Sequence, residues 1–452
     1  MNIIIAVIVL GILIFVHELG HFLVAKYFNV YVEKFSIGFG PRLYSRQYGE
    51  TEYTISAVPL GGYVKMYGEG VENNKQNMEE NSISENQVEP SKIGRSFLDK
   101  TPWQKAAIVL AGPLFNVLFA ILIFWGLYMT GINSYAPVLT NIEAGSPAYN
   151  AGLKDGDKVT AVDGKEIKSW TEFSEIISES SGKTLQLTLA DNRQVEVAVG
   201  SKEVDDIFGD KKHVGFIGAG LLVDAVVGEV VPDMPAEKAG IKAGDKIISI
   251  NNTPVLSWSM SAEYIRNNPD KELSISIDRK GEIINLTVTP KASETGSGEN
   301  KKEIGLIGVS PYQGDVVVRY NPLDAMILGL EKSYDLTKLI YAGLAKLVTQ
   351  DIPADSLGGP ILIMQTAAQS AESGLSTLLI FMAMISINLA VFNLLPIPVL
   401  DGGQLVIITA EGVMGRPLGE KVMGAFQMAG LCFIISLMIF AFYNDIMRFF
   451  KS

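Results

Sequence analysis

The chain has 452 residues, of which 48% are apolar and 19% charged, and its mean hydropathy is +0.25. This composition excludes intrinsic disorder, which requires low hydrophobicity and high charge, and the net charge of −12 argues against binding to nucleic acid. The only cysteine is Cys432, so the chain forms no internal disulfide and holds no metal through a set of cysteines.

Four segments of the chain are long, apolar and almost free of charge. The first covers residues 3–25 and is interrupted by His17-Glu18-Leu19-Gly20-His21, and the others lie between Lys105 and Glu143, between Glu372 and Asp401, and between Lys421 and Asp445. A helix needs ~20 mainly apolar residues to cross the hydrocarbon core, whereas a soluble helix of this length shows a polar face. We therefore expect a polytopic α-helical membrane protein with transmembrane helices at residues 1–28, 103–132, 372–400 and 422–446.

Lysine and arginine residues near the helix ends predict the orientation. Basic residues concentrate between the first and second helices and again between the third and fourth, whereas none follows the second helix before Lys154. Because cytoplasmic loops carry the excess of Lys and Arg, we expect residues 29–102 and the loop of residues 401–421 in the cytoplasm. The region between the second and third helices then lies outside, as do both termini, although the tail of residues 447–452 carries two basic residues that argue weakly against this.

The first cytoplasmic region shows the pattern of a small β-structure. Residues Glu52–Met66 indicate two short strands around a turn at Gly61-Gly62, and Phe35–Pro41 contains a G-x-G segment beside them. An ordinary cytoplasmic hairpin is the simplest interpretation of this pattern. Residues 68–92 are rich in Glu, Asn and Ser, which predicts a mobile loop.

The region outside the membrane contains an internal repeat. Ser146-Pro147-Ala148 is matched 88 residues later by Met234-Pro235-Ala236, and Trp170 by Trp258. The pattern A-G-L-x-x-G-D-x-V after the first segment returns at the same offset as A-G-I-x-x-G-D-x-I. A fixed offset predicts two copies of one domain, which we place at residues 133–221 and 222–312. The pattern resembles bacterial, circularly permuted PDZ domains, an α+β fold that takes a peptide as an added strand. Peptide binding and steric filtering both stay open, beside a role as simple spacers.

Residues 313–371 connect the repeats to the third transmembrane helix. Within them, Pro322–Gln350 places apolar side chains at helical spacing, which is typical of an amphipathic helix at a membrane–water interface. The sequence Gly358-Gly359-Pro360 breaks the chain before the third transmembrane helix.

The first helix carries the residues of a metal site. In His17-Glu18-Leu19-Gly20-His21 the two histidines share one helix face and can bind one ion, and Glu18 can reach a water beside it as a general base. Ionisable groups inside an apolar helix are costly and usually functional, although they could merely hydrogen-bond between helices. Catalytic zinc takes three protein ligands, and Asp401 fits the third place because it follows the proline-broken end of the third helix. Asp401 could instead be only a turn residue.

H-E-L-G-H in the first helix and N-L-L-P-I-P-V-L-D-G-G at the end of the third together resemble the site-2 protease family of intramembrane zinc metalloproteases. The tandem modules narrow the resemblance to members found in Gram-negative bacteria, and it covers essentially the whole chain. It implies Zn²⁺ bound by His17, His21 and Asp401, with Glu18 as the general base. It also suggests Asn393 as a catalytic residue that hydrogen-bonds the substrate or the developing oxyanion, unless this amide only holds the broken helix together.

The resemblance extends to the β-structure. It implies that Gly61, Gly62, Tyr63 and Val64 bind substrate as part of a membrane-reentrant β-loop. A peptide bond within a helix is shielded, so the enzyme must hold its substrate extended, and pairing with an edge strand does this through main-chain hydrogen bonds.

We therefore expect a protease of the bacterial inner membrane that cleaves single-pass transmembrane segments in the lipid bilayer. Its active site lies near the cytoplasmic side and its repeats in the periplasm. By resemblance, regulated intramembrane proteolysis of a membrane anti-sigma factor and cleavage of remnant signal peptides are its tasks, and the PDZ pair excludes bulky substrates. The alternatives are a membrane scaffold with a vestigial metal site and a membrane zinc protease that acts on misfolded proteins.

Overall fold

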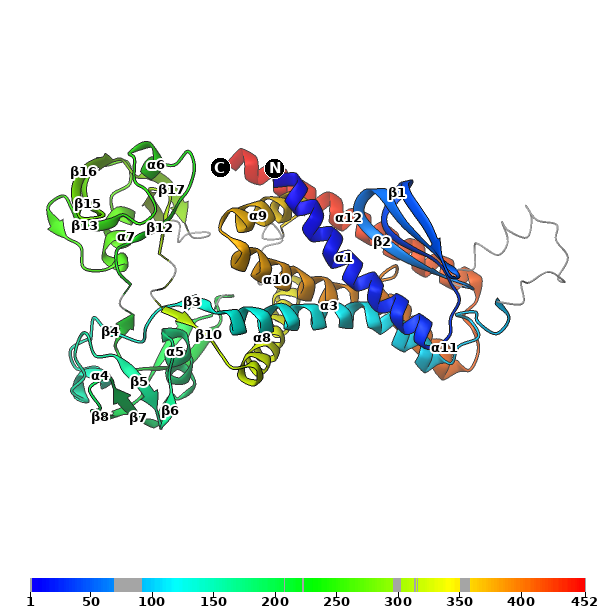
Figure 1. Ribbon diagram of the computed structural model, residues 1–452, viewed down its shortest axis with the longest axis horizontal. Helices are drawn as coiled ribbons and strands as arrows, with labels where there is room; N and C mark the ends of the chain where they lie inside the picture. Colours follow the sequence, from blue (N-terminus) through cyan, green and yellow to red (C-terminus); the bar gives the residue numbers. More distant parts are fainter. Residues whose placement is uncertain are drawn as a thin grey trace. The chain divides into compact units, whose positions relative to one another are not determined.

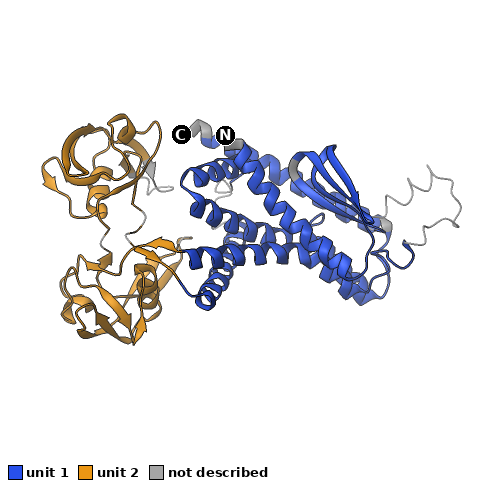
Figure 2. Cartoon of the chain, in the orientation of Figure 1, with its two compact units in different colours: residues 1–130, 320–452 blue, residues 131–319 orange. Residues whose placement is uncertain are grey.

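The computed structural model describes residues 2–68, 92–206, 208–221, 223–295, 302–312, 314, 316–349 and 358–451. The chain divides into two compact units, one of residues 1–130 and 320–452 and the other of residues 131–319 (Figure 2). The mobile loop expected at residues 68–92 lies almost entirely outside the described residues, so it stays a prediction.

Four long apolar helices form the frame of the first unit (Figure 1). They are α1 (Asn2–Tyr27), α3 (Pro102–Thr130), α10 (Leu375–Asn393) and α12 (Glu420–Lys451). Each contains a stretch long and apolar enough to cross a membrane, which agrees with the prediction of four transmembrane helices. Helix α3 packs against both α1 and α10 and so joins the two ends of the chain.

Two further helices lie between the repeats and α10. Helix α8 (Pro322–Val348) matches the predicted amphipathic helix; Asn321 caps its N-terminus, and it packs across α3, where the indole N–H of Trp125 donates to the carbonyl of Pro322. Helix α9 (Pro360–Glu372) begins at the predicted chain break. Its first turn is held by α12, because the backbone N–H groups of Gly359 and Ile361 donate to the buried carboxylate of Asp445 at 2.8 and 2.9 Å.

The segment after α10 differs from the sequence-based expectation. Most of the loop expected at residues 401–421 is a helix, α11 (Asp401–Met414), separated from α10 by a short break. The break is tight because Gly402 and Gly403 lie against the backbone carbonyls of Leu395 and Ile397, where a side chain would collide. Sequence patterns predicted the break from its prolines but not the helix that follows.

The β-structure is a bent antiparallel pair, β1 (Val32–Tyr48) and β2 (Thr51–Met66). Residues 32–37 of β1 pair with residues 52–55 of β2 on one side and with residues 62–66 on the other. Residues 52–55 run parallel to β1 there and residues 62–66 run antiparallel to it, so β2 reverses direction between residues 55 and 62. Gly61 and Gly62 lie at the end of this reversal, close to the expected turn. They permit close approach, since a Cβ on Gly61 would overlap the ring of Phe39 and one on Gly62 would overlap Glu18.

The turn between the two strands is fixed by charge. Glu50 accepts hydrogen bonds from both terminal nitrogens of Arg95, at 2.6 and 2.7 Å, and also contacts Lys26 at the end of α1. The Arg95 guanidinium lowers the pKa of Glu50 below its usual range, so this pair is ionised at neutral pH. The sheet is thereby tied to the end of α1 and to the segment before α3.

The second unit contains two repeats with the same order of elements. The first has α4 (Pro147–Asn150), β5 (Val159–Val162), β6 (Lys165–Glu166), α5 (Trp170–Glu179), β7 (Thr184–Leu189), β8 (Gln194–Ala198), β9 (Gly200–Asp205) and β10 (Lys211–Phe216). The second has α6 (Pro235–Lys238), β13 (Lys246–Ile250), β14 (Thr253–Pro254), α7 (Trp258–Arg266), β15 (Leu273–Arg279), β16 (Glu282–Val288), β17 (Lys291–Thr295) and β18 (Lys302–Leu306).

Sheet orders β6-β5-β7-β8 and β14-β13-β15-β16 confirm the internal repeat, and each copy buries its own apolar core. Short pairs complete the unit: β4 (Leu139–Thr140) with β11 (Gly220–Leu221), β12 (Val227–Val230) with β19 (Val309–Pro311), and β3 (Ile132–Ser134) with β20 (Val316–Val318). The last pair joins the entry of the unit to its exit. The PDZ assignment of the repeats stays a prediction.

An ion pair between Asp245, the residue before β13, and Arg279, the last residue of β15, makes the second repeat sensitive to acid. The Asp245 side chain is 1% exposed and accepts two 2.7 Å hydrogen bonds from Arg279. Burial raises the pKa of Asp245, but hydrogen bonds from Arg279 and from the Lys242 backbone N–H outweigh it, so the pKa lies below its ordinary value of 3.8. The ionised form therefore stabilises the fold above that value, and the stabilisation is lost as the pH falls through the lower folded pKa.

We predict that Asp245→Asn destabilises the second repeat by about 1.5–3 kcal/mol at pH 7, because a charged hydrogen-bond pair is broken. Hydrogen exchange of the β13 and β15 amides in the full chain measures this, and the difference from wild type should shrink below pH 4. The matched control is Asp157→Asn in the first repeat. Its partner Arg193 is 44% exposed, so the cost there should be below about 1 kcal/mol. Equal effects in both repeats would contradict the prediction.

Candidate active site

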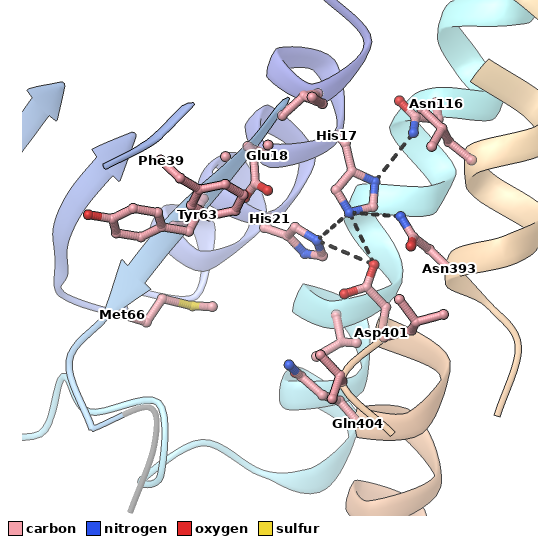
Figure 3. A pocket seen from close by; sticks show the side chains of 18 of the residues that line it. His17, Glu18, His21, Phe39, Tyr63, Met66, Asn116, Asn393, Asp401 and Gln404 are labelled. Atoms are coloured by element: carbon pink, nitrogen blue, oxygen red, sulfur yellow. Dashed lines mark hydrogen bonds and ion pairs between the residues drawn. The ribbon is translucent and has the colours of Figure 1, made fainter. Parts of the chain in front are cut away.

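Two histidines of α1 point to one spot at the centre of the first unit. His17 and His21 are four residues apart on one helix, so their rings lie on the same face, and their Nε2 atoms are 3.2 Å apart (Figure 3). His21 is held from behind, because its Nδ1 lies 2.9 Å from the backbone carbonyl of Ile108 on α3. This contact leaves Nε2 of His21 directed at His17.

Asp401 joins the histidines from the other end of the chain. It is the first residue of α11, and its Oδ2 lies 3.2 Å from Nε2 of His17 and 3.6 Å from Nε2 of His21. This oxygen is buried and has no hydrogen-bond partner among the described residues. A buried carboxylate oxygen without such a partner is costly, so the arrangement calls for a cation between the three side chains.

The spacing of these donors fits zinc. Two ligands at ~2.0–2.1 Å from a tetrahedral zinc ion lie about 3.3–3.4 Å apart, and the three observed separations are 3.2, 3.2 and 3.6 Å. Gly112 of α3 provides the space that the two histidine rings occupy, since a Cβ there would overlap Nε2 of His21 and Cε1 of His17. Nitrogen and carboxylate donors with one open position are typical of a catalytic zinc site.

Glu18 approaches the same spot from the side of the sheet. It follows His17 on α1, and Figure 3 shows its carboxylate between the histidine rings and β2. The backbone N–H of Val64 lies beside it, and Gly62 lies so close to its Cγ that no side chain fits. The position of Glu18 is thus set by β2 as well as by its own helix.

A cavity of about 630 Å³ opens beside the three donors. Residues 62–66 of β2 form one wall and, among the described strands, pair with β1 alone, which makes them an edge. Phe39 and Tyr63 stack at this wall with ring centroids 6.3 Å apart. The cavity is lined by residues of the β-structure and of the helices around the three donors: Ile14, His17, Glu18, His21, Phe39, Gly61, Gly62, Tyr63, Val64, Met66, Val109, Asn116, Leu389, Asn393, Val399, Leu400, Asp401, Gln404 and Ile434.

All nine sequence-predicted site residues line this one cavity. Asn393, at the last position of α10, directs its amide nitrogen to within 3.4 Å of Nε2 of His17. Sequence reasoning missed Gly112 and Asn116, both on α3. The available signal was an amide and a Gly-Pro step inside an otherwise apolar membrane helix, where polar groups and helix breakers need a reason.

Comparisons with known proteins cover the whole chain. The sequence profile of peptidase family M50 matches residues 5–437. The regulator of sigma-E protease RseP of Escherichia coli is 35% identical, with 98% of this chain and 97% of the relative covered. Protease RseP of Yersinia pestis is 37% identical over the same shares. A protein of Pasteurella multocida, whose name places it among zinc metalloproteases, is 34% identical over 98% of each chain.

Among solved structures, the HtrA-type protease AlgW with a decapeptide matches 34% of this chain and 60% of its own, at 15% identity and a TM-score of 0.16. A likeness of this strength carries no argument about the repeats.

The space at Gly112 yields a testable prediction. Gly112→Ala should weaken zinc binding by ~10-fold or more, because overpacking against the two histidines costs about 1–3 kcal/mol. Zinc content and affinity of the purified protein measure this. Gly126→Ala on the same helix is the control, since the position has open space around it, and both changes raise helix propensity by about 1 kcal/mol. Equal zinc binding by the two variants would show that the site does not need this space.

Proposed function

The chain belongs to peptidase family M50 and is an intramembrane zinc protease, and from this premise we propose the roles of its residues. His17, His21 and Asp401 hold the zinc ion, and Glu18 is the general base. The observation that supports this is the convergence of three donors at zinc-ligand spacing, from helices at opposite ends of the chain, on one spot beside Glu18.

The chemistry follows from these positions. Bound zinc polarises a carbonyl and lowers the pKa of water. Glu18 takes a proton from the attacking water and later gives it to the leaving amine, as a general base and then a general acid. The close contact with Gly62 keeps Glu18 beside β2, in the same cavity as the three donors.

Asn393 and β2 position the substrate. The amide of Asn393 points at the metal spot, so it can donate a hydrogen bond to the oxygen that gains negative charge during attack. The edge residues Gly61, Gly62, Tyr63 and Val64 offer main-chain groups to an unwound substrate segment. Their wall faces the three donors across one cavity, and therefore a strand added at this edge passes the catalytic groups.

The natural substrates are single-pass membrane proteins of the bacterial inner membrane. We propose a membrane anti-sigma factor among them, because relatives of 35–37% identity are named regulator of sigma-E protease RseP and protease RseP. Remnant signal peptides are the second group that we propose. The two repeats lie in the periplasm as PDZ domains and exclude substrates whose outward part is bulky. The active site then lies toward the cytoplasmic side of the membrane.

The role of Glu18 is tested with the nearly isosteric variant Glu18→Gln. We expect zinc to be retained and cleavage of a tagged single-pass substrate to fall by ~10²–10⁴-fold, the usual contribution of a positioned base. His17→Ala is the control and should lose both zinc and cleavage. Surviving cleavage in Glu18→Gln would show that another group is the base. If wild type binds zinc and cuts no transmembrane segment, the scaffold interpretation is favoured instead.

Filtering by the repeats is tested by removing them. Residues Ser134 and Val316 are paired neighbours in β3 and β20, so a short linker can join them. We expect wild type to cut a substrate trimmed outside the membrane and to spare the same segment carrying a folded outward domain. The shortened chain should cut both. If wild type cuts both substrates equally, the repeats do not filter by size.

A further inference from the structure

The two histidines of the site differ in the hydrogen-bond partner of Nδ1, the ring nitrogen that faces away from the metal site. A metal-binding imidazole donates its second N–H to an acceptor, which fixes the tautomer and the ring orientation. For His21 this acceptor is the backbone carbonyl of Ile108, at 2.9 Å from Nδ1. For His17 the group behind Nδ1 is a side chain, the amide of Asn116, with Nδ2 at 3.3 Å. Both holding groups belong to α3, eight residues apart.

The orientation of the Asn116 amide determines which ring nitrogen of His17 carries the proton. With Nδ2 facing it, Nδ1 of His17 acts as acceptor and the ring proton sits on Nε2, the nitrogen that faces His21 and Asp401. In that arrangement Oδ1 of Asn116 is buried without a hydrogen-bond partner among the described residues. An amide has nearly the same shape when turned over, and the turn places Oδ1 against Nδ1. His17 can then carry its proton on Nδ1 and present a free lone pair at Nε2.

We propose that Asn116 is a positioning residue that accepts the Nδ1 proton of His17 through Oδ1 and thereby sets the nitrogen with which His17 binds metal. This rests on the proposed role of His17 as a zinc ligand. Asn116 never touches the ion; it acts through the ring.

The surroundings of Asn116 hold it in place for this role. The residue is 0% exposed, on the inner face of α3. Its backbone carbonyl accepts a 2.8 Å hydrogen bond from Ser386 of α10, which is also fully buried. An amide this deep in an apolar helix is costly unless it is hydrogen-bonded, and His17 is its side-chain partner among the described residues. One residue thus joins α1, α3 and α10 at the metal site.

The test compares an apolar variant with one that keeps the acceptor. Asn116→Leu has similar size and no acceptor, so zinc affinity, measured by competition with a chromogenic chelator in detergent, should fall by ~10–100-fold, the usual effect of losing such a partner. Asn116→Asp keeps an oxygen against Nδ1 and should bind zinc at least as tightly as wild type. The absorption bands of the Co²⁺-loaded protein should change in Asn116→Leu and stay near wild type in Asn116→Asp.

Controls separate this inference from packing and from the proposed ligand set. Thr130→Val removes a polar group of α3 that bonds carbonyls of its own helix, and it should leave zinc affinity unchanged. Wild-type affinity in Asn116→Leu, or equal losses in Asn116→Leu and Asn116→Asp, would overturn the role of the hydrogen bond. If Asn116→Leu does not fold, weaker zinc binding by Asn116→Asp alone overturns it. Zinc binding that survives His17→Ala would instead refute the ligand assignment.

Discussion

The architecture of the first unit depends on one constraint: ionisable side chains inside apolar helices must be satisfied by one another or by an ion. Hydrocarbon offers no hydrogen bonds, so the groups of His17, His21 and Asp401 are tolerable only where they converge. Convergence requires α1 and α3 to approach closely, which Gly112 allows. It also requires the far end of the chain to return to the N-terminal helix.

That return is made by the break between α10 and α11. Val399 has a φ of +81°, a conformation that is unusual for a β-branched residue. Such strain persists only where the surroundings over-determine it, and here Gly402 and Gly403 pack the new helix against the end of the old one. The break brings Asp401 into the first turn of α11, within 3.2 Å of His17. An unbroken helix would carry this carboxylate away from the histidines.

The parts of this site that the sequence could predict are those set by local spacing. Positions 17 and 21 share a helix face whatever surrounds them, and the prolines before Asp401 predict that the helix is interrupted there. The 88-residue offset likewise predicted two copies of one domain. Gly61 and Gly62 were predicted only as turn residues, because their close approach to Phe39 and Glu18 depends on tertiary contacts that the local sequence does not contain. Asn116 was missed because its partner lies 99 residues away.

The cavity brings together two requirements of proteolysis within a membrane. A helical substrate hides its peptide bonds in its own hydrogen bonds, so cleavage needs competing main-chain partners as well as a catalytic centre. In this fold the same strand borders both: Gly62 lies against Glu18, and residues 62–66 expose an edge beside it. The residue that we propose as the base therefore contacts the strand that we propose to receive the substrate.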